Sequence, residues 1–157
     1  LGEALNQTAT GKVQFDKLVN SPQKIEVNID KGPAVYDKNG KLMPGLTVSA
    51  GTASTENGSN KTTVEVESAK MTIFMGSINK LIEEAKTKDV FSGEGKEPIT
   101  KAMTFDDVLG VIVGHEIDHT TNENNTIGAN GGNIENPAYE TSDKITREIK
   151  EKKLKKN

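Results

Sequence analysis

The sequence predicts an α+β protein in which strands come first along the chain and helices follow. Alternating apolar and polar residues at 24–30 and 62–67 indicate strands with one buried face. Apolar residues at helical spacing mark the segments 77–85 and 104–119. Because strands and helices do not alternate, we expect a small antiparallel or mixed sheet packed against the helix at 104–119 and a C-terminal helix.

The 157 residues fit a single domain, in which we expect 1–23 and 150–157 to be peripheral or flexible. Hydrophobic residues make up 32% of the chain and charged residues 27%, which predicts a compact body with polar loops and a solvated tail. The start at Leu1 lacks the basic and apolar parts of a signal peptide, so we expect a trimmed or excised segment.

Composition also argues against several classes of function. A net charge of -3 without a basic stripe argues against a nucleic-acid partner. No apolar run approaches the ~18 residues that a membrane-spanning helix needs. The chain has no cysteine, so disulfides and thiolate metal ligands are excluded.

The strand region contains one segment with two interpretations. Residues 46–49 form a candidate strand, and the Gly-, Ser- and Asn-rich segment 51–61 is typical of an exposed loop. Residues 62–67 and the apolar run 71–75 then predict a hairpin joined by a Ser-Ala-Lys connection. The strand at 71–75 is either interior or a sheet edge that binds an extended peptide by strand addition.

The helical region begins with clear signals and ends with weaker ones. Thr104 and Asp107 have the pattern of a capping box, which predicts a helix start. Gly110 and Gly114 predict close packing against another backbone, because glycine within a helix costs about 1 kcal/mol relative to alanine. We expect a flexible loop at 121–133. A last helix is predicted from about residue 136, with a proline in its first turn and a frayed end.

The second helix ends in the sequence His115-Glu116-Ile117-Asp118-His119. Two histidines four residues apart on a helix share one face and can bind the same ion. Zinc held there would lower the pKa of a water to about 7, and Glu116 would take its proton and pass it to the leaving amine. These are the 2 histidines of the chain, and chance would give this pattern roughly once in a thousand chains. The motif predicts a zincin-type peptidase.

A catalytic zinc takes three protein ligands, so a third must come from outside the motif. One class of zincin continues with a histidine six residues after His119, but Asn125 stands there and is a poor ligand. The remaining candidates are the acidic residues that follow the motif: Glu123, Glu135, Glu140 and Asp143.

Helical geometry separates two of these candidates. At about 100° per residue, Glu135 projects near the apolar stripe of the last helix, whereas Glu140 projects to the opposite side. We therefore predict Glu135 as the third ligand, with Glu140 second and better explained as a solvent-facing residue. Ala138, Ile145 and Ile149 form the stripe.

Two other residues near the motif have a functional and a structural interpretation. Asp118 is either an acceptor for a zinc-bound imidazole or a solvated helix residue. Tyr139 either stabilises the oxyanion of a tetrahedral intermediate or simply packs.

Three segments carry a resemblance: Gly114-His-Glu-Ile-Asp-His-Thr120, Glu135-Asn-Pro-Ala138, and Asp143-Lys-Ile145 with Glu148. They resemble the effector-type zinc metallopeptidases of the zincin superfamily, which are secreted bacterial effectors and toxin domains. The resemblance implies a zincin-like α+β fold, one zinc ion, a protein or peptide substrate, and secretion or delivery by a secretion system. It also supports Glu135 as a ligand.

The leading hypothesis from the sequence is a zinc-dependent endopeptidase in which His115, His119 and Glu135 hold the metal and Glu116 is the general base and acid. One alternative is an inactive zincin-fold module that binds a protein partner, against which the intact Glu116 argues. The other is a zinc-dependent hydrolase of other substrates, which the shape of the cleft would discriminate. The sequence leaves the oligomeric state open.

Overall fold

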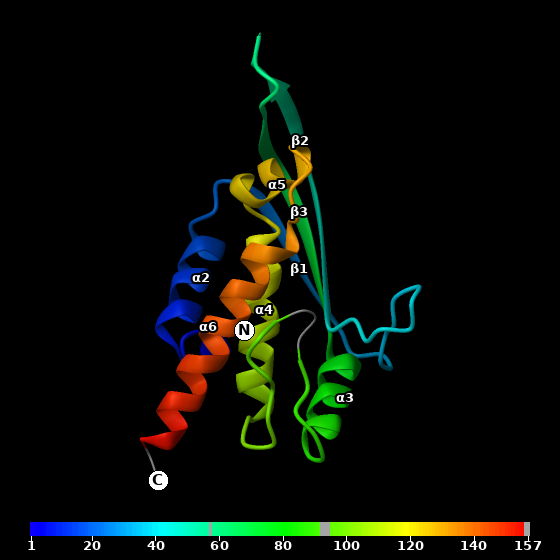
Figure 1. The fold of residues 1–157 in the computed structure, drawn as a ribbon, viewed down its shortest axis with the longest axis vertical. Helices are drawn as coiled ribbons and strands as arrows, with labels where there is room; N and C mark the ends of the chain where they lie inside the picture. Colours follow the sequence, from blue (N-terminus) through cyan, green and yellow to red (C-terminus); the bar gives the residue numbers. More distant parts are fainter. Residues whose placement is uncertain (57, 92–94, 156–157) are drawn as a thin grey trace.

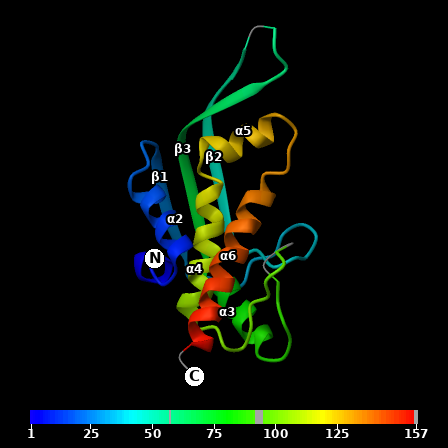
Figure 2. The same ribbon diagram turned by 60° about the vertical axis from the view of Figure 1, so that its left-hand side comes forward.

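The computed structural model describes residues 1–56, 58–91 and 95–155. Within them the chain forms a three-stranded sheet and six helices, so the predicted α+β class with a small mixed sheet is confirmed. The elements are β1 (Lys24–Asp30), β2 (Gly45–Thr55), β3 (Thr62–Phe74), α1 (Gly2–Leu5), α2 (Ala9–Val19), α3 (Met75–Ala85), α4 (Phe105–Asp118), α5 (Asn122–Ala129) and α6 (Glu135–Leu154). Helices α2, α4 and α6 lie in front of the sheet, and the β2–β3 hairpin extends beyond them (Figure 1 and Figure 2).

Strand β3 lies at the centre of the sheet, with β1 parallel on one side and β2 antiparallel on the other. The predicted hairpin in this region is wrong, because β3 runs without a turn through residues 68–70. Strand β3 has one extra residue, Glu67, opposite the step from Ala50 to Gly51 of β2, and this bulge explains the misleading pattern. It shifts the buried face of β3 from even-numbered residues such as Val66 to odd-numbered ones such as Met71, which breaks the alternation.

The apolar run 71–75 is interior, and the interpretation as a sheet edge is wrong. Met71 and Ile73 have no exposed surface, because β3 has neighbours on both sides. The edge strand beside the end of α4 is β2. Residues 51–55, predicted as part of a loop, extend β2, and residue 57 of that predicted loop lies outside the described residues.

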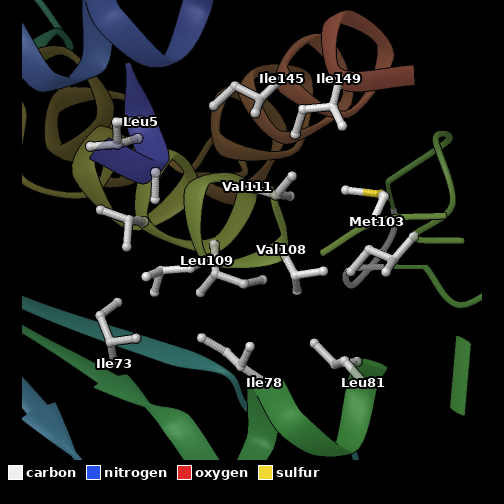
Figure 3. Packing of buried hydrophobic residues seen from close by; sticks show 14 of the residues in the cluster. Leu5, Ile73, Ile78, Leu81, Met103, Val108, Leu109, Val111, Ile145 and Ile149 are labelled. Carbon is white, nitrogen blue, oxygen red and sulfur yellow. The ribbon is translucent and has the colours of Figure 1, made fainter. Parts of the chain in front are cut away.

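Helix α4 forms the centre of the hydrophobic core, with every residue from Asp107 to Asp118 buried. Figure 3 shows Val111 facing the α6 residues Ile145 and Ile149, while Val108 faces α3 on the opposite side. The predicted capping box is confirmed, since Thr104 accepts from the backbone of Asp107 and the Asp107 carboxylate accepts from the backbone of Thr104. The capping box fixes the residue at which α4 begins, and the packing of the helix in the core fixes the position of the motif at its end.

Both glycines of α4 admit close neighbours, but the predicted packing against another backbone holds for Gly110 alone, because Gly114 meets a side chain. A Cβ at Gly110 would lie 2.7 Å from the carbonyl oxygen of Ala4, so the backbone of α1 packs directly on α4. A Cβ at Gly114 would lie 2.4 Å from the side chain of Ile145 in α6. Residues 1–23, which the sequence suggests are peripheral, form α1 and α2 and bring the fully buried Leu5 into the core.

Helix α5 occupies the segment predicted as a flexible loop, and that prediction is wrong. Before β1 begins at Lys24, which pairs with Ser68, the outer edge of β3 has no neighbouring strand among the described residues, and α5 covers it instead. The backbone N–H groups of Val66, Val64 and Thr62 donate to the side chains of Asn122, Thr126 and Asn130 respectively, over 2.7–2.9 Å. The acceptors are four residues apart on α5, a rise of about 6 Å, and the donors are two residues apart on β3, about 6.7 Å. The spacing of the side chains on the helix therefore matches the spacing of the N–H groups on the strand.

Helix α6 is longer than the sequence predicts. It begins at Glu135 and continues to Leu154, through most of the segment expected to be a frayed tail, of which residues 156–157 lie outside the described part. Ile149 is buried against α4, and Lys153 pairs with the buried Asp107 at 2.8 Å. These contacts hold the last turns of α6 against the core.

The covering of β3 by α5 predicts a measurable contribution to stability. Replacing Asn122 with alanine leaves the backbone N–H of the buried Val66 without its acceptor, which should lower the free energy of unfolding by about 1–2 kcal/mol. Urea denaturation monitored by circular dichroism measures this loss. The control is Glu123→Ala in the same turn, which should cost less because Glu123 is exposed. Equal losses in the two variants would contradict the contact.

Candidate metal centre

The two motif histidines and Glu135 form one compact cluster. His115 lies in the last turn of α4, His119 is its C-cap residue, and Glu135 is the first residue of α6. The Nε2 atoms of the imidazoles are 3.2 Å apart. Of the Glu135 carboxylate, Oε2 lies 3.2 Å from Nε2 of His115 and Oε1 lies 3.5 Å from Nε2 of His119. Among the described residues, this is the group of three or more acidic or imidazole side chains whose geometry suits one metal ion.

The spacing of the two imidazoles fits one edge of a tetrahedral zinc site, and the Glu135 carboxylate lies within reach of the same ion. Zinc binds imidazole nitrogen and carboxylate oxygen at about 2.0–2.1 Å, so two ligands at the tetrahedral angle lie about 3.3 Å apart. The Nε2 atoms of the two imidazoles, 3.2 Å apart, match this value, and the Glu135 carboxylate places a different oxygen 3.2–3.5 Å from each of them. Two nitrogens and one oxygen are also a donor set that zinc accepts, and three ligands leave a fourth position open.

The other acidic candidates lie elsewhere. The Asp143 carboxylate accepts hydrogen bonds from the backbone N–H groups of Lys96 and Glu97, which attaches the segment before α4 to α6. Glu123 and Glu140 border a separate pocket between α2, α5 and α6. Only Glu135, of the four candidates, stands beside the imidazoles.

Charges within the cluster reinforce one another. Hydrogen bonds with His115 and His119 hold the pKa of the Glu135 carboxyl far below its usual range, against the opposing effect of burial. Burial favours the neutral form of His119, but the hydrogen bond to Glu135 and its negative charge outweigh this effect and raise the pKa of the imidazole. The metal-free cluster therefore favours a positive charge between the imidazoles and the carboxylate, at the place where a cation would lie.

Glu116 lies beside the cluster without belonging to it. Its side chain is buried, and burial raises the pKa of its carboxyl above the ordinary value. The Thr47 hydroxyl donates to Oε2 of Glu116 at 2.8 Å. A Cβ at position 45 would lie 2.5 Å from Oε1, so glycine at the start of β2 makes room for the carboxylate. Strand β2 thus holds Glu116 at the wall of the cleft.

Asp118 fits neither of its two interpretations from the sequence. It is buried and joins three neighbours: Gln14 at 3.0 Å, Lys17 at 3.2 Å, and the hydroxyl of Thr141. The Asp118 carboxylate therefore connects α4 to α2 and α6 on the side of the helix away from the cluster. None of these contacts is to an imidazole. The ring of Tyr139 packs 5.2 Å from the ring of His115, centre to centre, and also lines the cleft.

Two residues that the sequence did not single out contact the outer nitrogens of the imidazoles. Ser142 Oγ lies 3.2 Å from Nδ1 of His115, and the amide of Asn124 lies 3.2 Å from Nδ1 of His119. Ser142 was recognisable as a residue near the inward stripe of the last helix. Asn124 gave no signal, because its segment has no apolar period.

An open cleft surrounds the cluster and Glu116. Its walls come from the start of β2, the end of α4, the start of α6 and the loop before β2, including Leu42, Met43 and Pro44. A neighbouring pocket on the other side of His119 is lined by Val48 and Ser49 of β2 and by Ile134. Because β2 lines both hollows, its free edge passes directly along the cluster.

Comparison with known protein families, characterised proteins and solved structures gives no match to this chain. None of the described helices combines the length and apolar composition needed to cross a membrane. The inference of function therefore depends on the arrangement of the chain's own residues alone.

The coupling between Glu135 and His119 predicts a titration in the metal-free protein. The pKa of His119 should lie above its ordinary value of 6.5, and Glu135→Gln should lower it because the stabilising negative charge is lost. Imidazole NMR signals recorded against pH measure both values. Glu140→Gln is the control on the same helix and should leave the titration of His119 unchanged. A shift caused by Glu140→Gln and not by Glu135→Gln would contradict the arrangement.

Proposed function

We propose that the chain is a zinc-dependent endopeptidase of the zincin type. His115, His119 and Glu135 hold the metal, and Glu116 is the general base and then the general acid. The observation that carries this proposal is the pairing of two features: three side chains whose ligand atoms lie close enough to share one ion, and a separate buried carboxylate in the same cleft. A site that only stores or binds zinc has no need of the second feature.

The residues around the cleft suit hydrolysis of a peptide bond. Zinc bound to the three ligands would polarise the substrate carbonyl and make the attacking water more acidic. Glu116 would take the proton from that water and deliver it to the leaving amine, and its raised pKa makes the carboxylate a stronger base for the first of these steps. The Thr47 hydroxyl holds one oxygen of the carboxylate, which reduces the freedom of Glu116 before the reaction. Tyr139 stays a prediction as a donor to the oxyanion.

The edge of β2 supports a peptide as the substrate. Within the described sheet β2 pairs on one side only, and its residues Gly45, Leu46 and Thr47 line the cleft. An extended peptide can add to such an edge through main-chain hydrogen bonds, with its side chains in pockets on either side. Leu46, Val48 and Ile134 are exposed beside the cluster, at 43%, 61% and 40% of their surface, and offer apolar contact to those side chains.

The direct test replaces Glu116 with glutamine, which keeps the shape of the side chain and removes its basicity. We expect hydrolysis of an unfolded protein substrate such as casein to fall by at least about 100-fold, with one zinc per chain retained. His119→Ala should lose both the zinc and the activity. Activity is measured by peptide release, and zinc by elemental analysis. Glu140→Gln, outside the cleft, is the control that should keep both.

Full activity in the Glu116→Gln variant would contradict the assigned mechanism. Zinc bound by the parent without hydrolysis of any protein substrate would favour a binding module that keeps the site. No zinc in the parent after incubation at neutral pH would exclude the metal centre itself.

A further inference from the structure

The imidazole of His115 can present Nε2 to a metal only when its proton lies on Nδ1. Ser142 Oγ, 3.2 Å from Nδ1, also lies 3.0 Å from the carbonyl oxygen of Ala138. A carbonyl can only accept, and a hydroxyl has one proton, so Ser142 donates to Ala138 and accepts from His115. The proton of His115 is thereby drawn to Nδ1, and the lone pair of Nε2 faces His119 and Glu135.

The amide of Asn124 meets the same requirement at His119. The amide places Nδ2 3.2 Å from Nδ1 of His119, while Oδ1 is buried without a hydrogen-bond partner among the described residues. The two ends of an amide have nearly the same shape and are assigned from their hydrogen bonds. A half-turn of the amide brings the unpartnered oxygen to Nδ1, where it accepts the proton of an imidazole whose Nε2 holds a metal.

Both acceptors are held by elements packed on the rest of the fold. Ser142 is buried where α6 meets α4. Asn124 is buried in α5, which the hydrogen bonds from Val64 and Val66 fasten to β3. In addition, the side chain of Asn125 donates to the carbonyl oxygen of His119 at 2.9 Å. The acceptors are thus in place before a metal arrives.

We propose that Ser142 and Asn124 are the positioning residues of the metal site, accepting the Nδ1–H groups of His115 and His119 and directing both Nε2 lone pairs to one ion. This inference rests on the proposed metal site and adds residues to it that the motif does not contain. Hydrogen-bonded partners of this kind typically change metal affinity by about 10- to 100-fold.

The test measures zinc affinity by competition with a chromophoric chelator and follows the imidazole protons by NMR. The chain contains 2 histidines, so each Nδ1–H signal of the zinc-loaded protein can be assigned by comparing variants. Ser142→Ala and Asn124→Leu should each weaken zinc binding by about 10- to 100-fold and remove or shift the signal of the histidine they contact. Ser77→Ala, another buried serine with backbone hydrogen bonds, is the control and should change neither.

Asn124→Asp distinguishes an acceptor from a donor at this position, because a carboxylate can only accept. We expect the variant to keep the Nδ1–H signal of His119 and to bind zinc at least as tightly as the parent. Loss of that signal in Asn124→Asp would overturn the role of Asn124.

The failure of this inference is distinguishable from failure of the proposed function. A parent that binds no zinc would overturn both. A parent that binds zinc, with folded Ser142→Ala and Asn124→Leu variants whose affinities lie within about twofold of it, would overturn the positioning role alone.

Discussion

The burial of α4 on all sides is the constraint on which the other elements depend. A helix that is apolar all round must be enclosed by neighbours, and the sheet, α1, α3 and α6 supply them. The helix nevertheless ends in two histidines and two carboxylates. Moving such groups out of water costs free energy unless they find partners, so the neighbours must also supply hydrogen bonds at this end.

The polar groups at the end of α4 find their partners on four neighbouring elements: β2, α2, α5 and α6. Glu116 is held by β2, His115 by α6, and the backbone and side chain of His119 by α5. Asp118 points to the back of the helix and joins α2 and α6. The contacts that make burial possible are therefore the same contacts that orient the site, and the three candidate metal ligands, the proposed base and the edge of β2 meet at one place.

Local patterns in the sequence account for what could be predicted. The capping box at Thr104, the spacing of the histidines and the helical periodicity that turns Glu135 inward all depend on residues close together in the chain. Helix α5 could not be predicted this way, because it is polar and is stabilised by the uncovered edge of β3. The contact between Thr47 and Glu116 depends equally on a strand that is distant from α4 along the chain, so no local pattern predicts it.

The metal centre can be tested most directly by anomalous X-ray diffraction from crystals grown with zinc, recorded on both sides of the zinc absorption edge. The account predicts one strong peak at about 2.0–2.2 Å from Nε2 of His115, Nε2 of His119 and a carboxylate oxygen of Glu135. It also predicts that Glu116 stays outside ligand distance. A peak ligated by Glu116 in place of Glu135, or no peak at the cluster, would contradict it.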